Sequence, residues 1–354
     1  MLKILELFGG IGACSKALER LNIDYEIVDY VEIDKYAVAS YNAIHNTNFE
    51  PQDITTWNKD VEVDLIMHGS PCQDFSLAGK QAGGDKDSGT RSSLMYETIR
   101  IVEKLKPKYV IWENVKNLLS KKHRHNFDAY LKTMESLGYI NYYQVLNAKD
   151  YGIPQNRERV FTVSVLNSRI LKDISFKFPP KQELKLKLKD MLEDKVDEKY
   201  YLSDKMIKYI SANNEKWTGN NDKSIINKSI ASAINTGEGS RRCDASNYVS
   251  NKVEENYDLK EPMIYDDRDK GWGVKITDIC STQRAMRAGI KCIYPDLRIR
   301  KLTPKECWRL MGFDDSDYEK AAQVNSNTQC YKQAGNSICV PVLEAILREL
   351  LKNE

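Results

Sequence analysis

A cysteine follows a proline in GSPCQDFS, residues 69–76, directly after the apolar run VDLIM. A cysteine kept only for packing usually has apolar neighbours, among which it acts as a small hydrophobe. Cys72 instead opens the polar, glycine-rich stretch CQDFSLAGKQAGGDKDSGTRSS, whose composition predicts an exposed loop. Reactive thiolates occupy accessible settings of this kind. Cys72 is therefore a candidate nucleophile.

Carboxyl and guanidinium groups flank two later strand candidates. KYVIWENVKNL places Glu113 after a buried-looking strand, and YGIPQNRERVF supplies Gln155, Arg157 and Arg159 before the next one. A carboxyl group in a partly apolar site can keep a proton near neutrality and act as an acid or hydrogen-bond donor. Two arginines spaced two apart on an extended segment face the same way. They could hold a carbonyl oxygen, a phosphate or Glu113 itself; a charged edge strand is the alternative, above all for Arg157.

A glycine-rich turn separates the first strand candidate from the first helix. In ELFGGIGACSKAL, Gly9, Gly10 and Gly12 would let the backbone approach a ligand beside a helix N-terminus. Glu32 follows the second strand and could hold ribose hydroxyls, and Asp53 could accept from an adenine amino group. Taken singly, each is better explained as a cap or turn residue, but together they predict an adenosine-containing ligand. No Gly-Lys-Ser/Thr pattern indicates triphosphate chemistry.

Length and composition limit the class of protein. The chain has 354 residues, of which 41% are hydrophobic and 29% charged, enough for two domains. No apolar run approaches the ~20 residues of a membrane helix, and MLKILELFGG is not a secretory signal, so we expect a cytoplasmic protein with reduced thiols. Eight cysteines and four histidines lack zinc-site spacing, so no structural metal is expected. With a net charge of +2, any polyanion must be met by local basic patches.

Strand-like and helical patterns alternate over the first half of the chain. We expect strands at 3–8, 25–33, 63–68, 108–114, 142–146 and 159–165, and helices at 13–21, 35–45, 93–106 and 127–138. This alternation predicts an α/β fold with a doubly wound, mostly parallel sheet. Ligands bind such sheets outside the carboxyl ends of the strands. We expect the candidate residues at that edge.

The pattern changes after Ser168. The lysine-rich stretch SRILKDISFKFPPKQELKLKLKD is interpreted as a linker or domain edge, and residues 200–296 are interpreted as an inserted small domain of irregular or β structure. Regular helices return near the end, where Thr303 should cap a helix that starts at Pro304. We expect a last helix over 340–353. The predicted division is 1–170 for a catalytic domain, 171–297 for the inserted domain and 298–354 for a segment that returns to the first.

Several of these motifs stand in the order of a known family. Pro71-Cys72, Glu113-Asn114-Val115 and the Gln155, Arg157, Arg159 series resemble three signature motifs of the cytosine-C5 DNA methyltransferases of bacteria and phages. LFGGIG resembles the family's S-adenosylmethionine (AdoMet) loop, and RKLTPKECWRLMGF and YKQAGNSICVPVLEAI resemble its two C-terminal motifs. The likeness covers about 3–166 and 298–350, and the segment between fits the variable target-recognition domain.

The resemblance implies a Rossmann-like fold with AdoMet as cofactor. Cys72 would be the nucleophile, Glu113 and Arg159 would grip the target cytosine, and Gln155 and Arg157 would complete the catalytic motif. The residues implied at the cofactor are Phe8, Gly10, Ile11, Gly12, Glu32, Ile33, Asp53, Ile54, Pro71, Asn336 and Ser337. Glu6 stands where the family often has aspartate, and Ala13 where a further glycine is common.

Such chemistry gives each group a task. Cytosine C5 is a poor nucleophile until a thiolate adds to C6, which splits one hard step into easier ones. Glu113 would bond N3 and the amino group, and Arg159 would stabilise charge at O2. The base must be flipped out of the duplex, and the glycine-containing loop after Cys72 would close over it. Lys80 and Arg91 would meet phosphates, and Arg241 and Arg284 are candidates for base contacts.

The expected substrate is double-stranded DNA, bound by a monomer in a bacterial or phage-infected cell. Any cognate restriction endonuclease would act separately, and no membrane partner is expected. One alternative is an RNA methyltransferase, since one branch of the family modifies transfer RNA. Another is a catalytically inert DNA-binding regulator on the same fold. The joint presence of Cys72, Glu113 and Arg159 weighs against the inert regulator.

Overall fold

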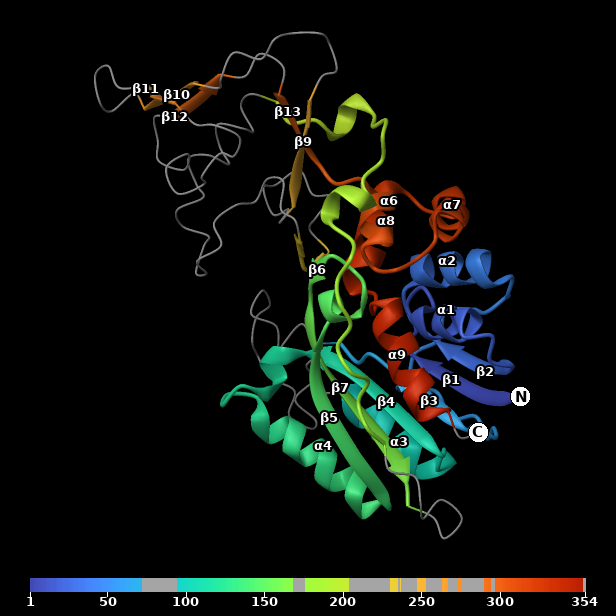
Figure 1. Cartoon of the computed structure of the whole chain (residues 1–354). Coiled ribbons are helices and arrows are strands. Elements are labelled where there is room, and N and C mark those ends of the chain that lie inside the picture. Colours follow the sequence, from blue (N-terminus) through green and yellow to red (C-terminus); the bar gives the residue numbers. More distant parts are fainter. Residues whose placement is uncertain are drawn as a thin grey trace.

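A six-stranded sheet in the order β2-β1-β3-β4-β7-β5 forms the centre of the structure (Figure 1). The computed structural model describes residues 1–71, 94–167, 176–203, 230–234, 236, 247–252, 263–266, 273–275, 290–293 and 297–352. The strands are β1 (Leu2–Leu7), β2 (Tyr25–Val31), β3 (Leu65–His68), β4 (Tyr109–Val115), β5 (Tyr139–Asn147) and β7 (Glu158–Leu166). Neighbours among β2, β1, β3 and β4 are parallel, whereas β7 is antiparallel to both β4 and β5. The expected α/β fold with a mostly parallel, doubly wound sheet is confirmed.

Helices bury both faces of this sheet. One face is covered by α1 (Ala13–Arg20) and α9 (Val340–Leu350), and the other by α3 (Met95–Leu105) and α4 (Arg124–Ser136). Side chains alternate between the faces along β4: Tyr109 and Ile111 join the first core, and Val110 and Trp112 join the second. A sheet buried on both faces needs nearly continuous apolar strands, which is why these segments lack a polar side.

The C-terminal helices pack beside the first half of the sheet. They are α6 (Pro304–Arg309), α7 (Asp315–Val324) and α8 (Asn327–Asn336), and α7 lies against α2 (Lys35–His45). The predicted cap is confirmed: the Thr303 side chain accepts from the Glu306 N–H, and the Glu306 carboxylate accepts from the Thr303 N–H. Short 3₁₀ segments occupy Lys116–Leu119, Ala148–Tyr151, Leu188–Met191 and Glu198–Tyr200.

The described part of the lysine-rich stretch packs on the central six-stranded sheet. Phe176, Leu188 and Met191 are buried in the same core as α1 and α9. The Tyr151 hydroxyl donates to the Pro179 carbonyl at 3.0 Å. After β7 the chain therefore runs back along this sheet toward α6 before it enters the inserted segment (Figure 1).

The regular elements described between residues 230 and 301 are all strands. Strand β8 (Ala231–Ser232) pairs in parallel with β6 (Gln155–Asn156), and β9 (Tyr248–Lys252) pairs with β13 (Leu297–Lys301). Strand β10 (Met263–Asp266) lies between β11 (Gly273–Lys275) and β12 (Ile290–Ile293). This agrees with the irregular or β character expected there. No helix in the described ranges is long and apolar enough to cross a membrane.

Candidate active site

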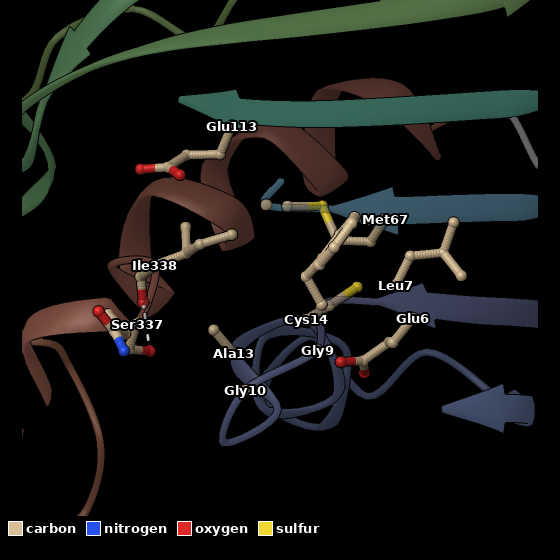
Figure 2. Close-up of a pocket in the computed structure, with 13 residues that line it drawn as sticks. Glu6, Leu7, Gly9, Gly10, Ala13, Cys14, Met67, Glu113, Ser337 and Ile338 are labelled. Carbon is tan, nitrogen blue, oxygen red and sulfur yellow. Dashed lines mark hydrogen bonds between the residues drawn. The ribbon is translucent and has the colours of Figure 1, made fainter. Parts of the chain in front are cut away.

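A cavity opens at the carboxyl edge of β1, β3 and β4 (Figure 2). The space between its walls is about 420 Å³, including the part open to solvent. Its walls come from β1 and the turn after it, the start of α1, the ends of β3 and β4, and the loop after α8. The lining residues are Glu6, Leu7, Phe8, Gly9, Gly10, Ala13, Cys14, Met67, Gly69, Glu113, Asn336, Ser337 and Ile338.

The turn between β1 and α1 forms one wall. Phe8 has a φ of 53°, in the left-handed region that non-glycine residues rarely adopt and that is concentrated at ligand sites. Gly10 also has a positive φ, and a Cβ built on it would meet nothing within 4 Å, so a ligand has room against this backbone. Gly12 must be glycine, because a Cβ there would lie 2.3 Å from His45 Nε2. Ile11 is buried in the core, so Ile11 and Gly12 support the turn while Phe8 and Gly10 face the cavity.

Glu32 supports the same turn from the end of β2. Its carboxylate accepts from the Gly10 N–H at 3.2 Å and from the Asp34 N–H at 2.8 Å. Burial raises the pKa of Glu32 above its ordinary value. The next side chain, Ile33, is 68% exposed although it is apolar. The structure thus places Glu32 directly behind the cavity wall, next to an apolar side chain that is open to a ligand.

Asp53 lies in a turn tethered to Glu32. The Gln52 N–H donates to the Glu32 carbonyl at 2.9 Å. The exposed Asp53 carboxylate accepts from the Thr55 N–H at 2.9 Å, and Ile54 is buried beneath the turn. Asp53 is not among the residues that line this cavity; it lines a separate, more open hollow with Gln52 and Trp57.

Glu113 and Arg159 form an ion pair at the opposite wall. Arg159 Nε lies 3.1 Å from Glu113 Oε1, and both side chains are largely buried. They meet because β7 runs antiparallel to β4, with Arg159 opposite Val115, so the start of β7 lies at the carboxyl edge of β4. Burial raises the pKa of Glu113, against the opposing effect of the Arg159 and Arg157 guanidinium groups. The carboxyl group is thus suited to hold or share a proton beside a fixed cation.

The loop after α8 completes the cavity. Asn336, the last residue of α8, lines the cavity. Ser337 and Ile338 follow it and lie across the cavity from the turn after β1 (Figure 2). Residues more than 300 positions apart in the sequence, Gly10 and Ser337, therefore share one cavity. The role in cofactor binding that the sequence suggests for Asn336 and Ser337 stays a prediction.

Cys72 lies outside the described residues, but the chain leading to it is held at two points. Trp112 Nε1 donates to Ser70 Oγ at 3.0 Å, and Asn114 Nδ2 donates to the Ser70 carbonyl at 3.3 Å. Pro71 is half-buried and directly precedes Cys72. Sequence reasoning did not assign a role to Ser70 or Trp112. The position of Asn114 beside Glu113 was the one available signal that this strand end anchors the nucleophile loop.

Gln155 and Arg157 are buried, and neither lines the cavity. Gln155 Nε2 donates to the Leu310 carbonyl at 2.6 Å, and its Oε1 accepts from the Ile234 N–H at 3.0 Å. Arg157 donates to backbone carbonyls, including that of Ser337 at 2.7 Å. The structure thus brings Glu113 and its partner Arg159 to the same cavity as Asn336 and Ser337. Gln155 and Arg157 are buried outside the lining of this cavity.

The four proposed DNA contacts lie outside the described residues. Lys80 and Arg91 belong to the stretch 72–93, and Arg241 and Arg284 belong to the inserted segment. They remain predictions from the sequence.

Several residues that line the cavity were not predicted as functional, among them the titratable Glu6 and Cys14. Glu6 is 1% exposed, and its carboxylate accepts from the Ser15 N–H at 3.0 Å and from the Ser15 hydroxyl. The titratable groups that face it, Cys14 and the Tyr25, Tyr30 and Tyr41 hydroxyls, are neutral at physiological pH, because burial raises the pKa of each. Burial also raises the pKa of Glu6 to about 7. The available signal was an acidic residue inside the apolar strand KILELF.

This buried carboxyl group should make stability depend on pH. Because the folded-state pKa of about 7 exceeds the ordinary value of 4.5, protonated Glu6 favours folding, and this contribution is lost as pH rises between those values. In the parent protein, ionisation of Glu6 should lower the free energy of unfolding by about 2–3 kcal/mol from pH 5 to pH 8. We expect Glu6→Gln to abolish this decrease. Urea unfolding at both pH values measures it. Glu26→Gln, an exposed glutamate on β2, is the control, and equal pH dependence in Glu6→Gln and the parent protein would contradict the expectation.

The whole chain matches one protein family. A model of the family described as C-5 cytosine-specific DNA methylase matches residues 2–352. The chain belongs to this family. Among relatives of this methylase, the Type II methyltransferase M2.ScrFI of Lactococcus lactis subsp. cremoris is 35% identical over 100% of both chains. The orphan methyltransferase M.SPRI of Bacillus phage SPR is 33% identical, with 99% of this chain and 97% of the phage protein covered.

Solved structures support the fold of the methylase. Entamoeba histolytica methyltransferase EhMeth has a TM-score of 0.69 at 14% identity, covering 100% of this chain and 98% of that one. Spodoptera frugiperda DNMT2 has a TM-score of 0.67 at 23% identity, covering 99% and 100%. At these identities the likeness shows the fold alone. The family and the DNA cytosine-5 methyltransferase activity expected from the motifs rest on the family model and the curated relatives, and both expectations are confirmed.

Proposed function

We propose that this DNA cytosine-5 methyltransferase binds AdoMet in the cavity and holds the flipped target cytosine between Glu113, Arg159 and Cys72. The observation that carries the proposal is the Glu113–Arg159 pair, which lies at the same sheet edge as the glycine turn. One end of the cavity would then take the cofactor, and the other would face the base.

The chemistry of the cavity walls fits AdoMet. Among the described residues that line it, only Glu6 and Glu113 are charged, and they approach from different strands (Figure 2). A ligand with a cationic sulfonium and ammonium suits such walls, whereas a pyrophosphate group would meet carboxyl groups and no described lining lysine or arginine. Glu32 and the exposed Ile33 stand where a ribose and an adenine would lie, with Asp53 beyond them. AdoMet, when bound, supplies an electrophilic methyl group.

The protein's own groups would activate the cytosine. The Cys72 thiolate adds to C6, so that electron density moves onto the ring and C5 becomes nucleophilic. Burial raises the pKa of the Glu113 carboxyl group; in its protonated form this group donates to N3 and accepts from the amino group. Arg159 stabilises charge at O2. Once C5 carries the methyl group, loss of the C5 proton to a base or water breaks the bond to Cys72 and restores the ring.

Recognition of DNA is assigned to the inserted segment. We propose the division 1–170, 171–297 and 298–354, with Lys80 and Arg91 at phosphates and Arg241 and Arg284 at bases. The strands described between 230 and 301 support a β-rich recognition domain. We propose a cytoplasmic enzyme that acts on duplex DNA as a monomer, separately from any cognate nuclease. The family model supports DNA as the substrate.

Methylation mapping tests the function. The purified protein is incubated with AdoMet and unmethylated genomic DNA, with total RNA in parallel, and 5-methylcytosine is mapped at single-base resolution. We expect modification at one short recurring DNA sequence. Product confined to RNA would favour the RNA methyltransferase alternative, and DNA binding without product would favour the inert regulator.

Cofactor binding gives a second test. We expect Glu32→Gln to raise the AdoMet dissociation constant roughly 10- to 100-fold, because it removes a charge-assisted hydrogen bond to the ribose. The substituted side chain keeps an amide oxygen that can accept from the Gly10 N–H, so the turn should persist. Isothermal titration calorimetry measures the constant, with the exposed Glu50→Gln as control. An unchanged dissociation constant would place the ribose elsewhere.

A further inference from the structure

Gln155 and Arg157 lie at a junction of three chain segments. Strand β6 (Gln155–Asn156) pairs with β8 (Ala231–Ser232), and the Ala231 N–H also donates to the Pro154 carbonyl at 2.7 Å. The side chain of Gln155 extends this contact in both directions: it accepts from the Ile234 N–H at 3.0 Å and donates to the Leu310 carbonyl at 2.6 Å. One side chain therefore ties residues 230–234 to the end of α6.

Arg157 ties the same residues to the cavity wall. Its guanidinium group donates to the Ile234 carbonyl at 3.0 Å, the Gly335 carbonyl at 3.2 Å and the Ser337 carbonyl at 2.7 Å. Ser337 lines the cavity, and Gly335 directly precedes Asn336, which also lines it. Because the guanidinium is planar, with donors in a fixed fork, these carbonyls are held in one geometry relative to one another. Arg157 is 4% exposed, so water does not compete freely for these bonds.

The junction continues into the inserted segment. The Asn247 side chain accepts from the Ser232 N–H at 2.8 Å and donates to the Ser232 carbonyl at 3.3 Å. Asn247 directly precedes β9, which pairs with β13 (Leu297–Lys301). Hydrogen bonds thus connect Asn247, just before β9, to Ser232 in β8. Two residues further along the chain, Ile234 is connected through Arg157 to the loop that closes the cavity.

We propose that Gln155 and Arg157 are positioning residues that couple the recognition segment to the C-terminal wall of the AdoMet cavity. This inference rests on the proposed AdoMet site. Arg157 holds Ser337 and Ile234 at once, so a recognition segment docked on its cognate DNA also steadies the wall that contacts the cofactor. Such a coupling is reciprocal: cognate DNA tightens AdoMet binding by the same factor by which AdoMet tightens DNA binding.

Arg157→Lys is the sharpest test, because lysine keeps the charge but cannot span the Ile234 and Ser337 carbonyls together. The AdoMet dissociation constant is measured without DNA, with a duplex carrying the sequence found by methylation mapping, and with a scrambled duplex. Steady-state kinetics give KM for AdoMet and kcat. We expect KM to rise roughly 10- to 100-fold, the value of one or more charge-assisted bonds, while kcat falls much less. The factor by which the cognate duplex tightens AdoMet binding should fall toward one.

The controls separate the possible outcomes. Arg348→Lys, an exposed arginine on α9, should leave all constants unchanged. Gln155→Met removes the side-chain hydrogen bonds to Ile234 and Leu310 at similar side-chain volume. It should also weaken the coupling between DNA binding and AdoMet binding, and it replaces Arg157→Lys as the test if that variant does not fold. A fall in kcat at unchanged KM would make Arg157 a catalytic residue and overturn the proposal, as would retained coupling in both variants. If the parent protein binds no AdoMet and methylates nothing, the proposed function fails first.

Discussion

Glu113→Gln is expected to lower kcat for methyl transfer by about 10²- to 10⁴-fold, the usual worth of a positioned general acid. Glutamine matches the shape and hydrogen-bonding pattern of a protonated glutamate, so the base can still be held. It cannot pass a proton to N3, however, and it leaves Arg159 without its carboxylate partner at 3.1 Å. Single-turnover transfer of a labelled methyl group to a cognate duplex measures the rate.

A matched variant distinguishes this role from a general loss of charge. Glu158 is an exposed glutamate on β7, next to Arg159 in the sequence, and its carboxylate pairs with Lys116 at 3.0 Å. The matched variant is Glu158→Gln. We expect it to stay within about twofold of the parent rate, since exposed pairs contribute little. DNA affinity should be similar in both variants. A general acid should contribute about 10²- to 10⁴-fold to the rate of methyl transfer. If Glu113→Gln stays within about threefold of the parent rate, Glu113 is not part of the mechanism.

Cys72→Ser is expected to abolish measurable turnover while DNA binding is retained. A serine hydroxyl is far less acidic than a thiol and is a weak nucleophile unless a base activates it, so the addition at C6 that activates C5 is lost. The loss should exceed about 10³-fold. A duplex with 5-fluorocytosine at the target position tests the covalent step directly. Because fluorine cannot leave as the C5 proton does, the adduct should persist and shift the protein on a denaturing gel.

Cys14 provides the control for this experiment. Its thiol lines the cavity, but burial raises its pKa well above the ordinary value, and the nearby Glu6 adds to the effect. Cys14→Ser should therefore still form the trapped adduct, whereas Cys72→Ser should not. An adduct that survives in Cys72→Ser would assign the nucleophile to another residue.

Local features of the fold follow from the sequence alone. Thr303, Pro304 and Glu306 specify a helix start through groups that contact one another within four residues. The helix over Lys35–His45 begins after Asp34, whose side chain caps the Tyr36 N–H. The glycine turn after β1 is equally local, because a positive φ at Gly10 and Gly12 is a property of those residues. Cys72, Glu113 and Arg159 were identified by residue type and motif order.

The direction of β7 was decided by the tertiary structure. In a sheet with every strand parallel, the residues before a strand lie at the edge opposite the carboxyl ends. Arg159 precedes most of β7, and it reaches Glu113 only because β7 is antiparallel to β4. The pattern of apolar residues in a strand buried on both faces is the same whether the strand runs parallel or antiparallel to its neighbour. The sequence pattern therefore predicted the residues of the site but not how they would meet.

The partners of buried polar groups were likewise decided by packing. Spacing indicated that Arg157 and Arg159 share a side, but it could not distinguish the carboxylate that Arg159 contacts from the backbone carbonyls that Arg157 holds. The raised pKa of Glu6 depends on the neutral groups that surround it once the chain is folded. Contacts such as Arg157 with Ser337 join residues 180 positions apart. The sequence by itself predicted which residues are candidates for the chemistry, through residue type and motif order. It also determined where helices and turns begin, because those depend on neighbours along the chain. Only the tertiary structure decided which charges meet, since that depends on groups brought together from distant strands.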